Sequence, residues 1–278
     1  MELSVNLNNP AQFFAAAGIA QLLGVSSRFD VEEHDGEPLP RSMFVLPDSD
    51  LQILLKNLKN ASYAERSESA GAVYSYDDDY SRPVLITLPA TTIELDWWLN
   101  QFWSKKSALK TWAGTSNPES ILRRLAGMID SDTTDILNHG LLASGSSRPT
   151  WGFDPRVTRN TGVAGRLAKV KIYPATELLC AVGLQYFRPL ITSGDITFHV
   201  WRDELPVELA MAVGELEGVR TLALNARREK RSKGIFNYTA AEFVANRAPF
   251  RATGRFANKD GRHGGQRAET MRLMDRFH

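Results

Sequence analysis

The chain has 278 residues, of which 43% are hydrophobic and 23% charged, so it can bury a large core. It contains no run of about 20 apolar residues and no basic stretch ahead of an apolar run at its start, so we expect neither a membrane-spanning helix nor a signal peptide. The single Cys180 excludes a disulfide within the chain, and we expect a cytoplasmic protein whose cysteine is inert packing.

The net charge of +1 hides a gradient along the chain. Residues 1–100 contain 6 Lys and Arg against 15 Asp and Glu, which gives a net charge of −9. Residues 220–278 contain 14 against 5, which gives +9. This asymmetry favours a polyanion as partner for one end, or an acidic face that docks on a basic neighbour.

Residues 10–23 are apolar nearly all round, which predicts a buried helix. Asn8 or Asn9 can cap this helix, and Pro10 suits its first turn because no N–H is needed there. A glycine inside a helix destabilises it by about 1 kcal/mol relative to alanine. We therefore expect that Gly18 allows another backbone to approach closely.

The following elements suggest a first domain over residues 1–91. We predict strands at residues 3–7, 28–32, 42–46, 72–76 and 84–88, a turn at Asp35-Gly36, a helix at 51–58 and a loop at 60–70. Asp77, Asp78 and Asp79 are best interpreted as a solvated turn, since adjacent carboxylates point in different directions. The order β-α-β-β-α-β matches a ferredoxin-like, split βαβ unit.

Residues 92–164 have the pattern of an inserted elaboration rich in helix and loop. Residues 93–102 fit either a helix or an extended strap, and residues 120–128 predict a helix. Basic residues interleave with tryptophans here, which suits single-stranded nucleic acid, because bases stack and phosphates pair with cations. The alternative is that the tryptophans are core residues. They are Trp97, Trp98, Trp103, Trp112 and Trp151.

Residues 172–187 repeat the pattern of the first helix. Phe14 aligns with Leu179 and Gly18 with Gly183, and a short alternating stretch precedes each copy. This match favours an internal duplication, and the alternative is a chance similarity between two buried helices. The duplication predicts a second ferredoxin-like unit with a basic C-terminal extension over residues 165–278. We expect strands at 168–172, 195–201 and 219–224, helices at 207–216 and 240–246, and a flexible loop at 249–268.

The fold class expected is therefore α+β, with two ferredoxin-like units and an α-rich insertion. Five cations between residues 227 and 233 repel one another unless a polyanion is near, so phosphate contact is the favoured interpretation. The candidate nucleic-acid-binding residues are Lys105, Lys106, Lys110, Arg123, Arg124, Arg227, Arg228, Lys230, Arg231, Lys233, Arg255 and Arg262.

Recognisable catalytic motifs are absent from the sequence. It has no Walker loop, no Gly-x-Gly-x-x-Gly, no His-Glu-x-x-His and no paired cysteines with zinc spacing. The five histidines share no ligand spacing, so we expect no metal, no cofactor and no catalytic residue. A metal-independent ribonuclease that processes precursor RNA, with His199 or His139 as base, stays open as an alternative.

Several stretches in order resemble the small Csb-type CRISPR-associated subunits of subtype I-U, now I-G. They are Asn9-Pro10…Phe13-Phe14…Gly18, Leu95-Asp-Trp-Trp98, Lys110-Thr-Trp-Ala-Gly114, Phe153-Asp154 and Tyr173-Pro-Ala-Thr-Glu-Leu-Leu…Gly-Leu-Gln-Tyr-Phe-Arg-Pro189. At one point of the last stretch the family pattern leads us to expect an arginine followed by a phenylalanine. This chain has Tyr186 followed by Phe187 there, and Arg188 is the candidate substitute for the missing arginine.

The resemblance implies a non-catalytic subunit of a Cascade-like effector, RAMP-like in fold, that binds crRNA, target DNA or neighbouring subunits. Such complexes hold the guide through its backbone and shape, while base pairing reads the sequence, so basic loops suffice. An adaptor that binds only other proteins is the remaining alternative.

Overall fold

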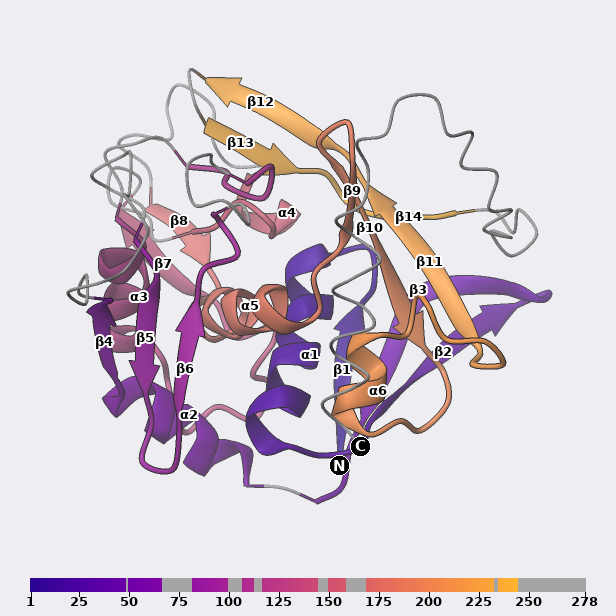
Figure 1. The fold of residues 1–278 in the computed structure, drawn as a ribbon, viewed down its shortest axis with the longest axis horizontal. Coiled ribbons are helices and arrows are strands. Elements are labelled where there is room, and N and C mark those ends of the chain that lie inside the picture. The colour runs from indigo at the N-terminus through magenta and orange to yellow at the C-terminus, as the bar shows by residue number, and fades with distance from the viewer. Residues whose placement is uncertain are drawn as a thin grey trace, which may run out of the picture. The chain divides into compact units, whose positions relative to one another are not determined.

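The computed structural model describes residues 1–48, 50–66, 82–99, 107–112, 117–144, 150–158, 169–232 and 235–244. These residues form a mixed α+β fold with six helices and several small sheets (Figure 1). Contacts divide the chain into two compact units, Met1–Val244 and Ala245–His278, and every described residue lies in the first. The expected boundaries near residues 92 and 165 stay predictions. Among the described helices, none has the length and apolarity needed to cross a membrane.

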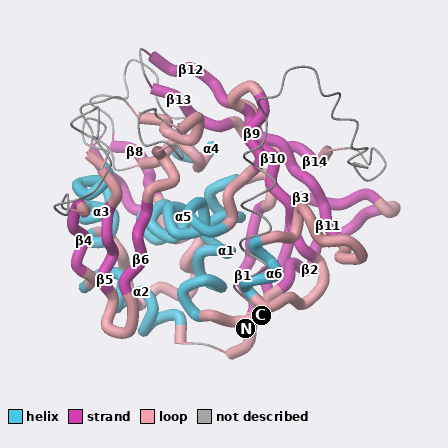
Figure 2. Tube along the Cα trace, viewed as in Figure 1, coloured by secondary structure: helices cyan, strands magenta, loops and turns pink. Residues whose placement is uncertain are grey.

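Two buried helices cross at the centre of the first unit, α1 (Pro10–Leu23) and α5 (Pro174–Tyr186). Figure 2 shows them in cyan between the strands of the surrounding sheets. The Asn9 side chain caps α1 by accepting from the Ala11 N–H, and Pro10 occupies the first turn, as predicted. The all-round apolar pattern of both helices is explained by this central position.

The helix crossing depends on two glycines. A Cβ built on Gly18 would lie less than 3.0 Å from the carbonyl oxygen of Leu179, and one on Gly183 would lie as close to the carbonyl oxygen of Phe14. The predicted close backbone approach at Gly18 is thus confirmed. Because Phe14 aligns with Leu179 and Gly18 with Gly183, the two contacts are reciprocal. The aligned residues of the two helices are therefore related by an approximate local two-fold.

The first sheet contains three of the four strands expected for a ferredoxin-like unit. Its order is β1-β3-β2, all antiparallel, from β1 (Glu2–Asn6), β2 (Arg28–His34) and β3 (Glu37–Val45). Asp35 and Gly36 form the β2–β3 turn with positive φ angles of 52° and 81°. After α2 (Leu51–Asn60), β4 (Ser62–Glu65) leaves this sheet and pairs with β5 (Val84–Thr87), which pairs with β6 (Thr92–Leu95).

The second half also departs from the expected topology. Its sheet has the order β14-β11-β10-β9, from β9 (Leu190–Thr192), β10 (Asp195–Trp201), β11 (Thr221–Ala226) and β14 (Glu242–Phe243). A split βαβ arrangement would place β8 (Lys169–Ile172) between β10 and β11. Instead β10 pairs directly with β11, and β8 pairs with β7 (Leu141–Ser144). The α+β class is confirmed, but a ferredoxin-like duplication is not.

Local predictions differ from the structure at several places. Residues 62–65 form a strand, not a loop, because Tyr63 is buried there and β5 supplies a partner. Residues 92–95 are extended, and α6 (Val207–Met211) is shorter than the predicted 207–216. The predicted strand at 72–76 and loop at 249–268 lie outside the described residues.

The predicted helix at residues 240–246 was wrong over the part that the structure describes. The Thr239 hydroxyl accepts from the Arg227 N–H and donates to the Ala240 carbonyl, rather than capping a helix. The Ala241 N–H donates to the Asn8 carbonyl, and Glu242 and Phe243 pair with β11. Tertiary partners for these backbone groups therefore override a local capping-box pattern.

One aromatic cluster joins the two halves around α1. The Phe13 ring stacks on Phe198 of β10 at 4.6 Å between centroids and on Phe29 of β2 at 5.5 Å. The Trp201 indole N–H donates to the Ser27 carbonyl, and Ser27 and Leu205 form an isolated antiparallel bridge.

The remaining elements are α3 (Pro118–Gly127), α4 (Pro155–Thr158), β12 (Arg228–Ser232) and β13 (Ile235–Tyr238).

Candidate nucleic-acid interface

The densest cationic run of the sequence forms an antiparallel hairpin of β12 and β13, which we call the basic hairpin (residues 227–232 and 235–238). Figure 1 shows it at the upper edge of the first unit. Arg227, Lys230 and Arg231 are exposed on it, and Arg228 is half-buried. Glu229 is the only acidic residue in this segment. The hairpin therefore presents concentrated positive charge to solvent.

Backbone hydrogen bonds fix the base of the basic hairpin to the core. The Phe236 N–H donates to the Thr111 carbonyl at 2.7 Å, and the Tyr238 N–H donates to the Gly152 carbonyl at 2.8 Å. The Arg228 N–H donates to Asp195 Oδ1 at 3.0 Å, and its guanidinium donates to the Lys110 carbonyl at 2.8 Å. The cations consequently lie on an ordered element whose position is set by the core.

Of the other predicted cations, the structure describes Lys110, Arg123 and Arg124. Lys110 is 5% exposed, and its ammonium lies 5.4 Å from the Trp112 ring, so it belongs to the core and not to a surface that a phosphate can reach. Arg123 and Arg124 are exposed on α3, where Arg123 pairs with Glu119 at 2.6 Å. Figure 1 shows α3 beside β4. Lys105, Lys106, Lys233, Arg255 and Arg262 lie outside the described residues.

Four tryptophans of the insertion are core residues, and the fifth, Trp103, lies outside the described residues. Trp97, Trp98, Trp112 and Trp151 are buried and pack mainly edge to face, with centroids 5.1 Å apart for Trp97 and Trp98 and 5.2 Å for Trp112 and Trp151. Their burial leaves no ring face for a nucleic-acid base. The sequence left open whether the tryptophans stack on bases or belong to the core, and these four residues belong to the core.

A buried charged cluster lies beside the first turns of α1 and α5, and sequence reasoning missed it. Asp154 is fully buried, accepts from the Asn9 amide at 3.0 Å and pairs with the Arg156 guanidinium at 2.7 Å. That guanidinium also lies 3.5 Å from the Tyr173 ring. Glu177, also fully buried, accepts from the Trp151 N–H at 3.0 Å and from the Thr150 hydroxyl at 2.8 Å. The only sequence signal was an Asp and a Glu within strongly apolar stretches.

Burial and the nearby Asp154 carboxylate raise the pKa of Glu177 to about 8. The folded state therefore keeps a proton that the unfolded state releases near pH 4.5, so this residue makes stability fall as pH rises from about 4.5 to 8. We expect Glu177→Gln to make the free energy of unfolding less dependent on pH in this range. At pH 8 the variant should have a free energy of unfolding about 1–4 kcal/mol higher than that of the wild type. Urea unfolding at several pH values measures this.

Glu208→Gln is the matched control, because Glu208 is exposed on α6. It should leave the pH dependence of the free energy of unfolding unchanged. Identical pH profiles for Glu177→Gln and the wild type would contradict the buried, protonated state assigned to Glu177.

The stretches that carry the family resemblance contact one another in the structure. Gln185 accepts from the Asp96 and Trp97 N–H groups and donates to Asp96 Oδ1 at 2.9 Å. Arg188 also pairs with Asp96, at 2.6 Å. The Thr111 hydroxyl donates to the Trp151 carbonyl. These stretches thus serve to hold the scaffold together, and Arg188 has a carboxylate partner within it.

The two histidines considered as bases have different surroundings. His199 on β10 packs against Gly214, and burial lowers its pKa. His139 Nε2 lies 3.5 Å from Asp130 Oδ2. Within the ranges that the structure describes, no three His, Cys, Asp or Glu residues come together as a metal site.

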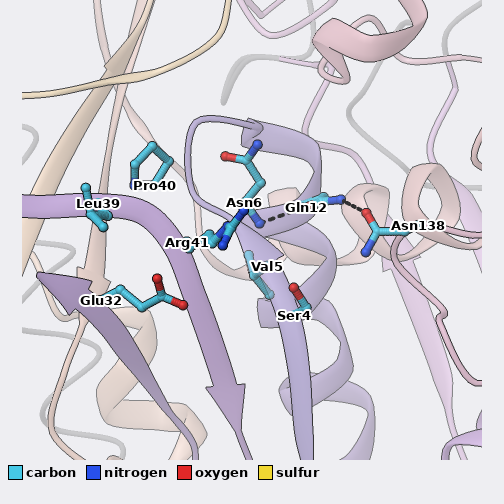
Figure 3. A pocket seen from close by; sticks show the side chains of 9 residues that line it. All are labelled: Ser4, Val5, Asn6, Gln12, Glu32, Leu39, Pro40, Arg41 and Asn138. Atoms are coloured by element: carbon cyan, nitrogen blue, oxygen red, sulfur yellow. Dashed lines mark hydrogen bonds between the residues drawn. The ribbon is translucent and has the colours of Figure 1, made fainter.

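A hollow of about 470 Å³ opens beside β1 and β3 (Figure 3). Gln12 lies at its inner side, accepting from the Asn6 N–H and donating to Asn138 Oδ1, both at 2.6 Å. Arg41 and Glu32 contribute opposite charges to its lining. Since the Gln12 amide is used in internal hydrogen bonds, we interpret the hollow as part of the scaffold.

Comparison of the chain with protein-family models, with curated proteins and with solved structures finds no match.

Proposed function

We propose that this chain is a non-catalytic, cytoplasmic subunit of a type I-U (I-G) CRISPR effector. In this proposal it binds crRNA or target DNA through the basic hairpin and contacts neighbouring subunits with other surfaces. The observation that carries the proposal is the exposed set of Arg227, Lys230 and Arg231 on a hairpin anchored to the core. The order of motif stretches along the chain supports the family assignment.

The charge distribution within the described residues is consistent with this role. The β2–β3 hairpin carries exposed Glu32, Glu33, Asp35 and Glu37, while the basic hairpin carries the exposed cations. Negative side chains repel phosphates and positive ones attract them. The basic hairpin therefore favours contact with nucleic acid, and the β2–β3 hairpin disfavours it.

Charge reversal tests the proposal. We expect Arg227→Glu combined with Lys230→Glu to weaken binding of a fluorescein-labelled 30-nucleotide RNA about 10–100-fold at 50 mM KCl. The slope of log affinity against log salt should also become shallower, because fewer counterions are released. Fluorescence anisotropy over a salt series gives both quantities.

Lys56→Glu combined with Lys59→Glu changes the net charge equally at exposed positions of α2 and serves as the control. We expect it to change affinity less than about 3-fold, since exposed charges separated from the RNA by more than a Debye length are screened. Equal weakening by both double variants, or no RNA binding by the wild type, would refute the proposed interface.

A further inference from the structure

The basic hairpin carries an aromatic ring among its cations. In the β12–β13 register Lys230 lies directly opposite Phe236, and Arg228 lies opposite Tyr238. Residues opposite one another in an antiparallel pair point to the same face, so these four side chains share one face of the hairpin. Tyr238, at the inner end, is buried, whereas Phe236 is half-buried and Lys230 is exposed.

Arg228 and Phe236 form a stacked pair. The guanidinium carbon of Arg228 lies 3.8 Å from the centroid of the Phe236 ring, which is the geometry of a cation–π contact. Both residues are tied to the core through their backbones, and the guanidinium also donates to the Lys110 carbonyl. The pair is consequently held in place before any ligand binds, which reduces the entropy lost on binding.

We infer that the Arg228–Phe236 pair is a base-stacking subsite for single-stranded nucleic acid, with Lys230 contacting an adjacent phosphate. This inference rests on the proposed function and narrows its ligand to the single-stranded class. A base stacks on aromatic rings and on guanidinium planes, and every base has a face suited to this contact. A duplex buries its base faces between neighbouring pairs, so it can use Lys230 but not the stack.

Phe236→Leu separates stacking from charge, because it keeps an apolar side chain and removes the ring. For a labelled 20-nucleotide single strand we expect the Kd of Phe236→Leu to rise about 5–50-fold with an unchanged salt slope. For the matching duplex we expect less than a 2-fold change. Lys230→Gln should weaken binding of both the single strand and the duplex, and should reduce the slope of log affinity against log salt by about 1. Phe236→Tyr keeps the ring and should bind within about 2-fold of the wild type.

Each outcome decides between the claims. If Phe236→Leu weakens single strand and duplex equally, or weakens neither while Lys230→Gln weakens both, the stacking subsite is overturned and the proposed function stands. If Lys230→Gln and the Arg227→Glu/Lys230→Glu variant both leave the Kd unchanged, the proposed function fails with it. Far-UV circular dichroism and the fluorescence of the buried tryptophans show whether each variant is folded, and Phe236→Tyr is the control that changes residue 236 but keeps its ring.

Discussion

Gly183→Ala is expected to lower the free energy of unfolding by about 3 kcal/mol. The new methyl group would collide with the carbonyl oxygen of Phe14, which is backbone and cannot rotate away as a side chain can. Helices α1 and α5 would have to separate, which loosens the packing of the central core. Alanine's better helix propensity, worth about 1 kcal/mol, is too small to offset this. Gly18→Ala should behave alike, because its methyl group meets the Leu179 carbonyl. Urea unfolding curves measure both.

Gly127→Ala is the matched control for these variants. Gly127 is the last residue of α3, and a Cβ there meets nothing within 4 Å. This substitution should stabilise the protein by up to about 1 kcal/mol, so the sign of the effect reverses between the two sites. Equal effects at Gly127 and Gly183 would contradict the close helix crossing.

The double variant Gly18→Ala/Gly183→Ala should lose less stability than the sum of its single variants. Both methyl groups are accommodated by the same separation of α1 and α5, so the second one adds little once the helices have moved. If the two losses in free energy of unfolding were strictly additive, each contact would be relieved by its own local movement. That result would contradict the reciprocal geometry of the crossing.

Arg156→Ala is expected to lower the free energy of unfolding by about 3–5 kcal/mol. It leaves the fully buried Asp154 carboxylate without its cationic partner, and Glu177 lies close enough to interact with that carboxylate. The guanidinium hydrogen bonds to the Leu137 carbonyl and to Asn138 Oδ1 are lost as well, as is the stack on Tyr173. Adding Asp154→Asn should recover part of the loss by removing the unpaired charge.

Arg123→Ala provides the comparison, because Arg123 and Glu119 form an ion pair of almost the same length, 2.6 Å, on the outer side of α3. Arg123 is exposed, so water and salt screen its charge, and we expect a loss of only about 0.3–0.5 kcal/mol. A cost for Arg156→Ala no greater than that for Arg123→Ala would show that burial does not strengthen the Asp154 pair. Urea unfolding at pH 7 serves for both.

Much of the local structure could be predicted because it depends on residues close in sequence. The cap of α1 lies next to the helix that it caps, and the β2–β3 turn depends on Asp35 and Gly36. The need for a close contact at Gly18 could also be recognised, because a glycine within a buried helix requires a packing reason. The alignment of Gly18 with Gly183 even paired the two positions that meet.

The candidate site was predictable in its charge but not in its form. The cationic run at 227–233 indicated a polyanion partner, yet nothing local placed Phe236 beside Arg228 on a hairpin. The same limit applies to Lys110, whose burial against Trp112 depends on residues far along the chain. The exposed or buried state of a lysine or tryptophan is a tertiary property that residue type alone does not set.

By itself the sequence determined where the buried helices lie, the α+β class, the charge gradient and the positions at which two backbones must approach. Only the tertiary structure decided which strands pair, so that β4 joins β5 and β8 joins β7 instead of completing ferredoxin-like sheets. Helical periodicity, caps and turns are set within a few residues of chain. Strand partners, by contrast, are chosen by the burial and hydrogen bonding available across long sequence separations.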